Sequence, residues 1–273
     1  MTAASPDMGV RTSRWAEAWR DLTQSLRLTP FWMRLAYQRV RGRYQRLSLG
    51  LIWHPLSYAF VVISLGYMWA AIMGREASYF MPYVAVGFAT WFFISNAISG
   101  ATDIFNGARR HIMARPTPLM MFIFERTAAN LMAFFLEAPL FFLVALLVGR
   151  DFGWIVLLAL PGLGLLILNA IWANLFFAIA VARFPDLGEM VRNIMRIAFF
   201  FTPIIWSVDV NPRVENVSQW NPFYHAVEVV RAPFMGAPPD RISYIVVSAI
   251  AAVGLTLTIP MFVYARRRVP YWV

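Results

Sequence analysis

Long apolar runs constrain this chain more than any other feature. Hydrophobic residues make up 60% of its 273 residues and charged residues only 14%, against about 25% charged residues in ordinary globular chains. A helix needs about 20 apolar residues to cross the hydrocarbon core of a bilayer. We therefore predict an all-α, polytopic membrane protein with six transmembrane helices, at about Leu51–Gly74, Tyr79–Thr102, a third span ending near Val148, Phe152–Val181, Glu189–Val208 and Ile242–Tyr264.

The arginines predict the orientation of these spans. All 24 basic residues are arginine, and basic flanks are retained on the cytoplasmic side of a membrane. With both termini in the cytoplasm, 19 of the 24 arginines fall inside and 5 outside. This bias supports an even number of spans.

The N-terminal part is expected to differ from the rest. We assign residues 1–48 to a cytoplasmic tail with amphipathic interface helices, and residues 49–273 to the transmembrane domain. Within Ser13–Leu28, helical spacing places Trp15, Trp19, Leu22 and Leu26 on one stripe. Such a helix is typical of the membrane interface, and packing against a partner subunit is the alternative.

The composition excludes several kinds of chemistry. Without lysine the chain cannot carry a Walker A phosphate loop or form a lysine Schiff base, and without cysteine it has no thiol nucleophile. His54, His111 and His225 fall in separate regions of this topology, so they cannot converge on one metal. We expect no catalytic residue, no metal and no cofactor in this chain, and we predict that it is not an enzyme.

Glu137 is the one acid well inside a predicted span, and such residues are functional candidates by default. The alternative is a structural role, in which the carboxyl group of Glu137 hydrogen-bonds to backbone groups left unpaired by Pro139, since proline lacks a backbone N–H donor. An intramembrane enzyme centred on Glu137 is the least favoured function.

Aromatic and hydroxyl side chains share one face of the first predicted span. The spacing of four, three, four and three from Trp53 to Tyr67 places them on that face, and the second span repeats the pattern. Rings alternating with hydroxyls suit a sugar chain that slides past, whereas a helix–helix contact is the plainer alternative. The faces comprise Trp53, Ser57, Phe60, Ser64 and Tyr67 in the first span, Phe88, Phe92 and Ser95 in the second, and Arg192, Arg196, Phe199, Pro203 and Trp206 in the fifth.

Two connecting segments carry further candidates. Asp103–Leu119 is a cytoplasmic segment whose basic residues could pair with an acidic partner that supplies motion. Asp209–Pro239 is too apolar for an ordinary outer loop and is broken by prolines, which favours short re-entrant helices between spans five and six. Within it, Glu228 and Arg231 lie three apart and could pair.

Several short stretches occur in a characteristic order. They are Arg39–Arg46 followed by Leu49–Trp53, Ala182–Asp186, Phe201–Trp206, and Trp220-Asn221-Pro222 with His225, Glu228 and Arg231. Together these stretches resemble the membrane subunit of ABC-type polysaccharide exporters, which carry lipid-linked O-antigen or capsule chains. The resemblance covers the chain from about Leu28 to its end, and the ending Arg266–Trp272 is similar to the O-antigen branch.

This resemblance implies a homodimer in the bacterial inner membrane, bound to a separate ATPase subunit that holds ATP and Mg. It implies an undecaprenyl-pyrophosphate-linked glycan as substrate and a conduit lined by the first, second and fifth spans. Membrane lipids are the other expected partners, and nucleic acid is not. Export of capsule, teichoic acid, or a small lipid or drug is the alternative. The expected sites are lipid-phosphate access at Arg39, Arg41, Arg43 and Arg46, ATPase coupling at Arg109, Arg110, His111, Arg115 and Asp186, and an outer gate at Trp220, Asn221, Pro222, His225, Glu228 and Arg231.

Overall fold

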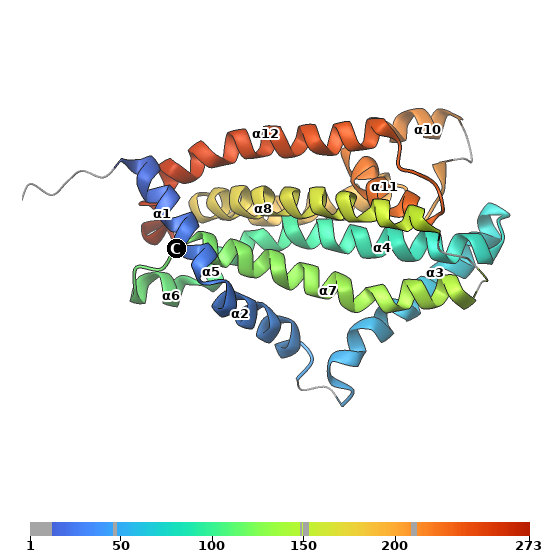
Figure 1. The fold of residues 1–273 in the computed structure, drawn as a ribbon, viewed down its shortest axis with the longest axis horizontal. Coiled ribbons are helices and arrows are strands. Elements are labelled where there is room, and N and C mark those ends of the chain that lie inside the picture. Colours follow the sequence, from blue (N-terminus) through green and yellow to red (C-terminus); the bar gives the residue numbers. More distant parts are fainter. Residues whose placement is uncertain (1–12, 46–47, 148, 150–152, 209–211) are drawn as a thin grey trace, which may run out of the picture.

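The chain folds into an elongated bundle of helices. The computed structural model describes residues 13–45, 48–147, 149, 153–208 and 212–273, and every regular element within those ranges is helical. Helices α1 and α6 and the C-terminus lie at one end of the bundle, and α10 lies at the other (Figure 1). In chain order the elements are α1 (Arg14–Arg27), α2 (Thr29–Gly42), η1 (Gly50–Ile52), α3 (Trp53–Met73), α4 (Ala77–Ser99), η2 (Gly100–Asp103), α5 (Ile104–Gly107), α6 (Arg109–Ala114), α7 (Met120–Leu147), η3 (Trp154–Leu158), α8 (Ala159–Arg183), α9 (Leu187–Phe201), α10 (Pro212–Ser218), α11 (Pro222–Phe234), α12 (Arg241–Ala265) and α13 (Val269–Trp272).

Helix α4 forms the centre of the bundle. It packs against α3, α7, α8, α9 and α11, and almost every residue between Phe80 and Ala97 is buried. A helix that is apolar on all sides belongs in the interior of a large bundle. Figure 1 shows α4 between α7 and α8 over most of its length.

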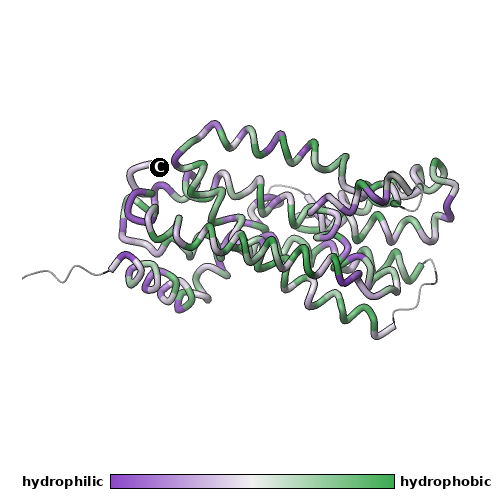
Figure 2. Tube along the Cα trace, turned by 90° about the horizontal axis from the view of Figure 1, so that it is seen from above, coloured by the Kyte–Doolittle hydropathy of each residue, from purple (hydrophilic) through white to green (hydrophobic). Residues whose placement is uncertain are grey.

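The all-α polytopic prediction is confirmed. Within the part of the chain that the structure describes, five helices are long and apolar enough to cross a membrane. Hydrophilic residues gather at the end of the bundle that holds the C-terminus, as Figure 2 shows. The five segments are Gly50–Met73, Ala77–Ala114, Met120–Leu147, Trp154–Arg183 and Arg241–Ala265.

The expected fifth span, Glu189–Val208, is not one continuous helix. Helix α9 has 15 residues and ends at Phe201, so it is about 22 Å long and shorter than the hydrocarbon core. Thr202 is extended, with φ −97° and ψ 131°, because a residue that precedes a proline disfavours the helical region. Residues 202–207, which follow α9, are therefore irregular backbone, called the irregular segment below.

Helix α1 is clamped to the bundle by a buried acid. Asp21 is fully buried and accepts hydrogen bonds, both 3.0 Å long, from the backbone N–H groups of Leu119 and Met120 at the start of α7. Arg266 donates to the same carboxylate at 2.7 Å. A carboxylate at a helix N-terminus satisfies donors that the helix itself cannot.

The bundle covers the apolar stripe of α1 only in part. Leu22 packs against the core, whereas Trp15, Trp19 and Leu26 are exposed. Their exposed surfaces are open to lipid or to another chain, so both alternatives stay predictions. The boundary between residues 48 and 49 also stays a prediction, although α1 and α2 pack directly on α7.

Candidate functional site

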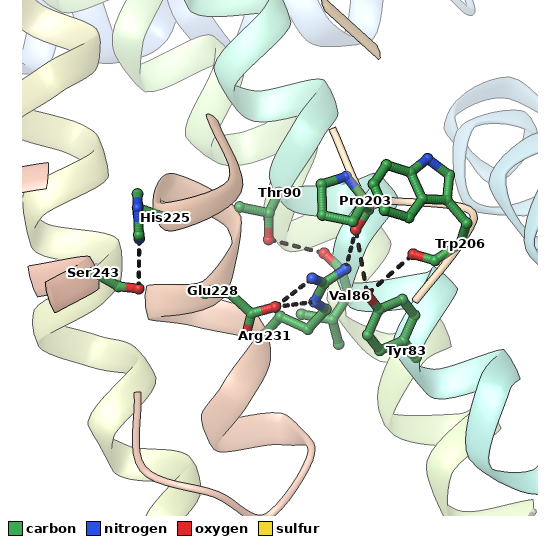
Figure 3. Close-up of polar contacts among 9 residues, drawn as sticks. All are labelled: Tyr83, Val86, Thr90, Pro203, Trp206, His225, Glu228, Arg231 and Ser243. Carbon is green, nitrogen blue, oxygen red and sulfur yellow. Dashed lines mark hydrogen bonds and ion pairs between the residues drawn. The ribbon is translucent and has the colours of Figure 1, made fainter. Parts of the chain in front are cut away.

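A buried arginine organises the part of the bundle that lies away from the C-terminus. Arg231 of α11 is fully buried, and its Nε donates to Oε1 of Glu228 at 3.0 Å (Figure 3). Its Nη1 donates to the carbonyl oxygen of Pro203 at 2.5 Å, and its Cζ lies 3.9 Å from the centroid of the Tyr83 ring. One guanidinium thus joins α11, the irregular segment and α4. The predicted pairing of Glu228 with Arg231 is confirmed.

The charge of this arginine is held by its surroundings. Burial by itself lowers the pKa of Arg231, but the Glu228 carboxylate together with Tyr83 and Tyr224 outweighs burial and leaves the pKa above its ordinary value. Tyr83 also donates to the backbone oxygen of Trp206 at 3.2 Å. A fork of fixed donors over a ring is an arrangement that lysine cannot reproduce.

Asn221 connects the ends of two helices. Its Oδ1 accepts from the backbone N–H of Phe223 at 2.9 Å, which caps α11, and Pro222 occupies the first helical position. Its Nδ2 donates to the carbonyl oxygen of Phe201 at 3.0 Å and to Oγ1 of Thr202 at 3.1 Å. The side chain therefore caps the end of α9 as well, where the helical run stops.

The remaining predicted gate residues divide into a buried and an exposed member. His225 is buried between Ser243 Oγ at 2.9 Å and the Gln219 carbonyl oxygen at 2.8 Å. Trp220 is almost fully exposed. Side chains of Tyr83, Asn221 and Arg231 hydrogen-bond to backbone oxygens at the end of α9 and in the irregular segment. The role of these residues as a gate stays a prediction.

The predicted conduit face of α3 lies on the surface of the chain. Helix α3 turns Val62, Gly66 and Ala70 toward its neighbours, and a Cβ at Gly66 would meet Met81 Cγ at 3.2 Å. The opposite face is uncovered. Phe60 and Tyr67 are 74% and 65% exposed. Ser57 and Ser64 are also exposed, and Trp53 is half-buried.

Other predicted conduit residues are placed differently. Phe88 is 4% exposed, with its ring 5.5 Å from that of Phe199, so it is a core residue and does not reach the surface of the chain. Phe92, Ser95 and Phe199 are half-buried. The face predicted for the fifth span is wrong beyond Phe199, because α9 ends before Pro203 and Trp206. Trp206 is half-buried in the irregular segment.

An elbow of arginines lies where α2 leaves the bundle. Arg39, Arg41 and Arg43 are exposed there, and Arg46 lies outside the described residues. Arg39 binds both carboxylate oxygens of Glu125 on α7, with Nε 2.5 Å from Oε1 and Nη2 3.0 Å from Oε2. The sequence pattern does not indicate a role for Glu125, because its partner Arg39 lies 86 positions away.

A polar cavity lies beside this elbow, between α3, α4 and α7. It holds about 200 Å³ and includes Glu137, whose Oε1 is 3.7 Å from Nε2 of His54. Glu137 is 3% exposed, and its Oε2 has no hydrogen-bond partner among the described residues. The cavity is lined by Arg43, His54, Ser57, Tyr58, Val61, Phe92, Phe93, Asn96, Asn130, Ala133, Phe134 and Glu137.

The predicted coupling residues gather at the end of the bundle that holds the C-terminus. The segment after α4 is helical, and Arg109, Arg110, His111 and Arg115 are exposed on or just after α6. Asp186 is exposed in the turn between α8 and α9.

An ion pair and a hydrogen bond connect η2, at the start of the predicted coupling segment, to α9. Nη1 of Arg192 donates to Oγ1 of Thr102 in η2 at 2.7 Å and lies 3.9 Å from Oδ1 of Asp103. A displacement of the segment after α4 would therefore act directly on α9.

Two comparisons with known proteins bear on these clusters. The profile of the ABC-2 type transporter family matches residues 31–235. The chain is also similar to the O-antigen export system permease protein RfbA of Myxococcus xanthus, with 23% identity over 173 residues. That match covers 63% of this chain and 66% of the relative, which is just under two thirds of its length.

Proposed function

The chain belongs to the ABC-2 type transporter family, which makes it a membrane-embedded transport subunit, and we propose that it exports a lipid-linked polysaccharide of the O-antigen kind. The family implies pairing with an ATP-binding subunit. In this proposal two copies of the chain meet in the bacterial inner membrane, with their termini in the cytoplasm. ATP and Mg are bound by the partner ATPase, and this chain performs no covalent chemistry.

The observation that carries the proposal is the uncovered face of α3. Small residues bring α3 against its neighbours, while Phe60, Ser64 and Tyr67 remain outside the packing of the single chain. Such a face, if it met only acyl chains, would gain nothing from its hydroxyls. Paired with a second copy, it offers ring faces and hydrogen-bonding groups to a hydrated polymer.

Transport then proceeds from the elbow to the outer cluster. The diphosphate of the carrier lipid is met by Arg39, Arg41 and Arg43, because guanidinium forks match phosphate oxygens. The glycan passes along α3. The cluster of Arg231 and Asn221 holds the irregular backbone that closes the outer end at rest.

ATP turnover in the partner must reach the bundle through contacts at its cytoplasmic end. Helix α6 presents Arg109 and Arg110 there, and Arg192 joins α9 to η2. The proposal assigns coupling to this route, together with His111, Arg115 and Asp186.

Copurification tests the proposal. We expect the tagged chain, purified from its native membrane, to retain an ATPase subunit that mass spectrometry identifies. The double variant Arg109→Glu with Arg110→Glu should retain about tenfold less of it, because reversed charges face the partner's acids. Arg241→Glu, on an exposed residue at the opposite end, should retain the full amount. Purification of the native chain without any ATPase would refute the proposal.

A further inference from the structure

The cavity between α3, α4 and α7 contains polar groups that the fold leaves unused. Oε2 of Glu137 and Nδ2 of Asn130 are buried without a hydrogen-bond partner among the described residues, and both side chains line the cavity. Leaving buried polar groups unpaired costs stability, so native proteins keep few of them. An acceptor and a donor held ready in one cavity point to a ligand with hydroxyl groups.

The remaining lining favours a sugar ring over an ion. The side chains of His54, Ser57 and Asn96 add groups that both donate and accept, and the rings of Phe92 and Phe134 add apolar faces. The described residues contain no group of three His, Cys, Asp or Glu side chains that could hold a metal. About 200 Å³ holds several water molecules or one six-membered ring.

The position of the cavity relates it to the proposed transport route. Arg43 borders the cavity and also a second, smaller one that contains Arg39 and Arg126. Nε of Arg126 is another buried donor with no partner among the described residues. A diphosphate at these arginines would therefore place the sugar attached to it beside the mouth of the larger cavity.

The same cavity reaches the face proposed for the glycan. Ser57 and Phe92, both predicted to line the conduit, are also part of its wall. Tyr44, which lines the smaller cavity, stacks on His54, with ring centroids 5.6 Å apart, and so connects the elbow to the wall of the larger cavity. The cavity is thus a side pocket between the arginines and the α3 face.

Resting on the proposed function, we infer that this side pocket binds the first sugar of the lipid-linked glycan. Glu137 accepts from one sugar hydroxyl, Asn130 donates to another, and the diphosphate stays at the arginines. The site would recognise a glycosylated diphosphate in preference to the bare carrier lipid.

The test compares two soluble probes on the full chain with its copurified ATPase in nanodiscs: farnesyl diphosphate, and farnesyl diphosphate linked to one glucose residue. We expect the glucose compound to bind about tenfold more tightly, which corresponds to about 1.4 kcal/mol at 25 °C. Glu137→Gln and Asn130→Leu should each reduce this preference to about one and leave binding of farnesyl diphosphate unchanged. Neither variant should lower the melting temperature, because Asn130→Leu removes an unused buried amide and Glu137→Gln replaces the carboxyl group by an amide of the same shape.

A matched variant controls for the loss of a buried amide. Asn174 of α8 is buried and donates to Thr127, away from the cavity. Asn174→Leu should keep the preference for the glucose compound. Equal affinity of the native protein for both probes would overturn the inference. Variants that lose affinity for both probes equally would also overturn it. So would a phospholipid that copurifies with the native protein and is lost from the Glu137→Gln and Asn130→Leu variants, because the cavity would then be a lipid site. Failure of the native protein to bind either probe would instead refute the proposed function.

Discussion

Replacement of both Phe60 and Tyr67 by alanine is expected to lower the amount of glycan on the cell surface by about tenfold or more, with the amount of the chain in the membrane unchanged. The rings lie outside the packing of the single chain, so their loss creates no cavity in it. They would, however, no longer supply the apolar faces on which sugar rings slide. Surface glycan and membrane abundance are measured in the same cells.

Two further variants make this result specific. Leu143→Ala removes an exposed apolar side chain from α7, and it should leave export normal. Phe60→Tyr with Tyr67→Phe keeps both rings and should restore export to near the native amount. Normal export by the double alanine variant at normal abundance would remove the α3 face from the mechanism.

Arg231→Met is expected to cause the largest loss of stability. It breaks a buried ion pair and leaves Glu228 and the Pro203 carbonyl group without their donor, and breaking a buried pair costs roughly 3–5 kcal/mol. For a chain of this length this corresponds to a fall of roughly 10 °C in melting temperature. Thermal unfolding of the purified protein, followed by size-exclusion chromatography, measures it.

A double-mutant cycle separates the pair from its surroundings. Glu228→Met added to Arg231→Met removes both charges, and it should recover part of the lost stability, because an apolar pair avoids an uncompensated buried charge. Arg196→Met, on the exposed side of α9, should change the melting temperature by no more than about 2 °C. Equal melting temperatures for Arg231→Met and the native chain would contradict the structural role assigned to this arginine.

Local patterns predict much of this fold. The bounds predicted for the first, second and sixth spans and for Ser13–Leu28 agree with α3, α4, α12 and α1 to within about three residues, and α7 ends one residue before the predicted end of the third span. The predicted start of the fourth span, Phe152, lies outside the described residues, and α8 begins at Ala159 after the short helix η3. The pairing of Glu228 with Arg231 follows from three-residue spacing on a helix. Each of these features is decided by neighbours in the sequence.

Contacts between distant residues decide what the sequence could not show. Asp21 binds a group 98 positions away and Glu125 binds one 86 positions away, and no local pattern indicates such a partner. Prolines give a further example. Pro82 and Pro139 are accommodated within long helices, whereas α9 ends before Pro203. Helix α9 does not continue through Pro203, because side chains of α4 and α11 bind the backbone of the irregular segment that follows it.

The candidate site was only partly predictable for the same reason. Helical spacing identifies residues on one face, but it does not say what covers that face. Phe88 and Phe92 share a face of α4, yet α9 buries the first and leaves the second half-exposed. Glu137 stands out from the sequence as an acid in an apolar run, whereas its cavity depends on three helices that only the fold brings together.

Water contact at α3 tests most directly whether this helix lines a shared conduit. The native chain has no cysteine, so Ser64→Cys on α3 and Leu143→Cys on α7 each place a single thiol on an exposed position. In native membranes during ATP turnover, a conduit predicts that a membrane-impermeant methanethiosulfonate labels Ser64→Cys about tenfold faster or more, since only a hydrated thiol ionises to the reactive thiolate. Labelling of Ser64→Cys as slow as that of Leu143→Cys would show that α3 faces lipid, which would contradict the conduit.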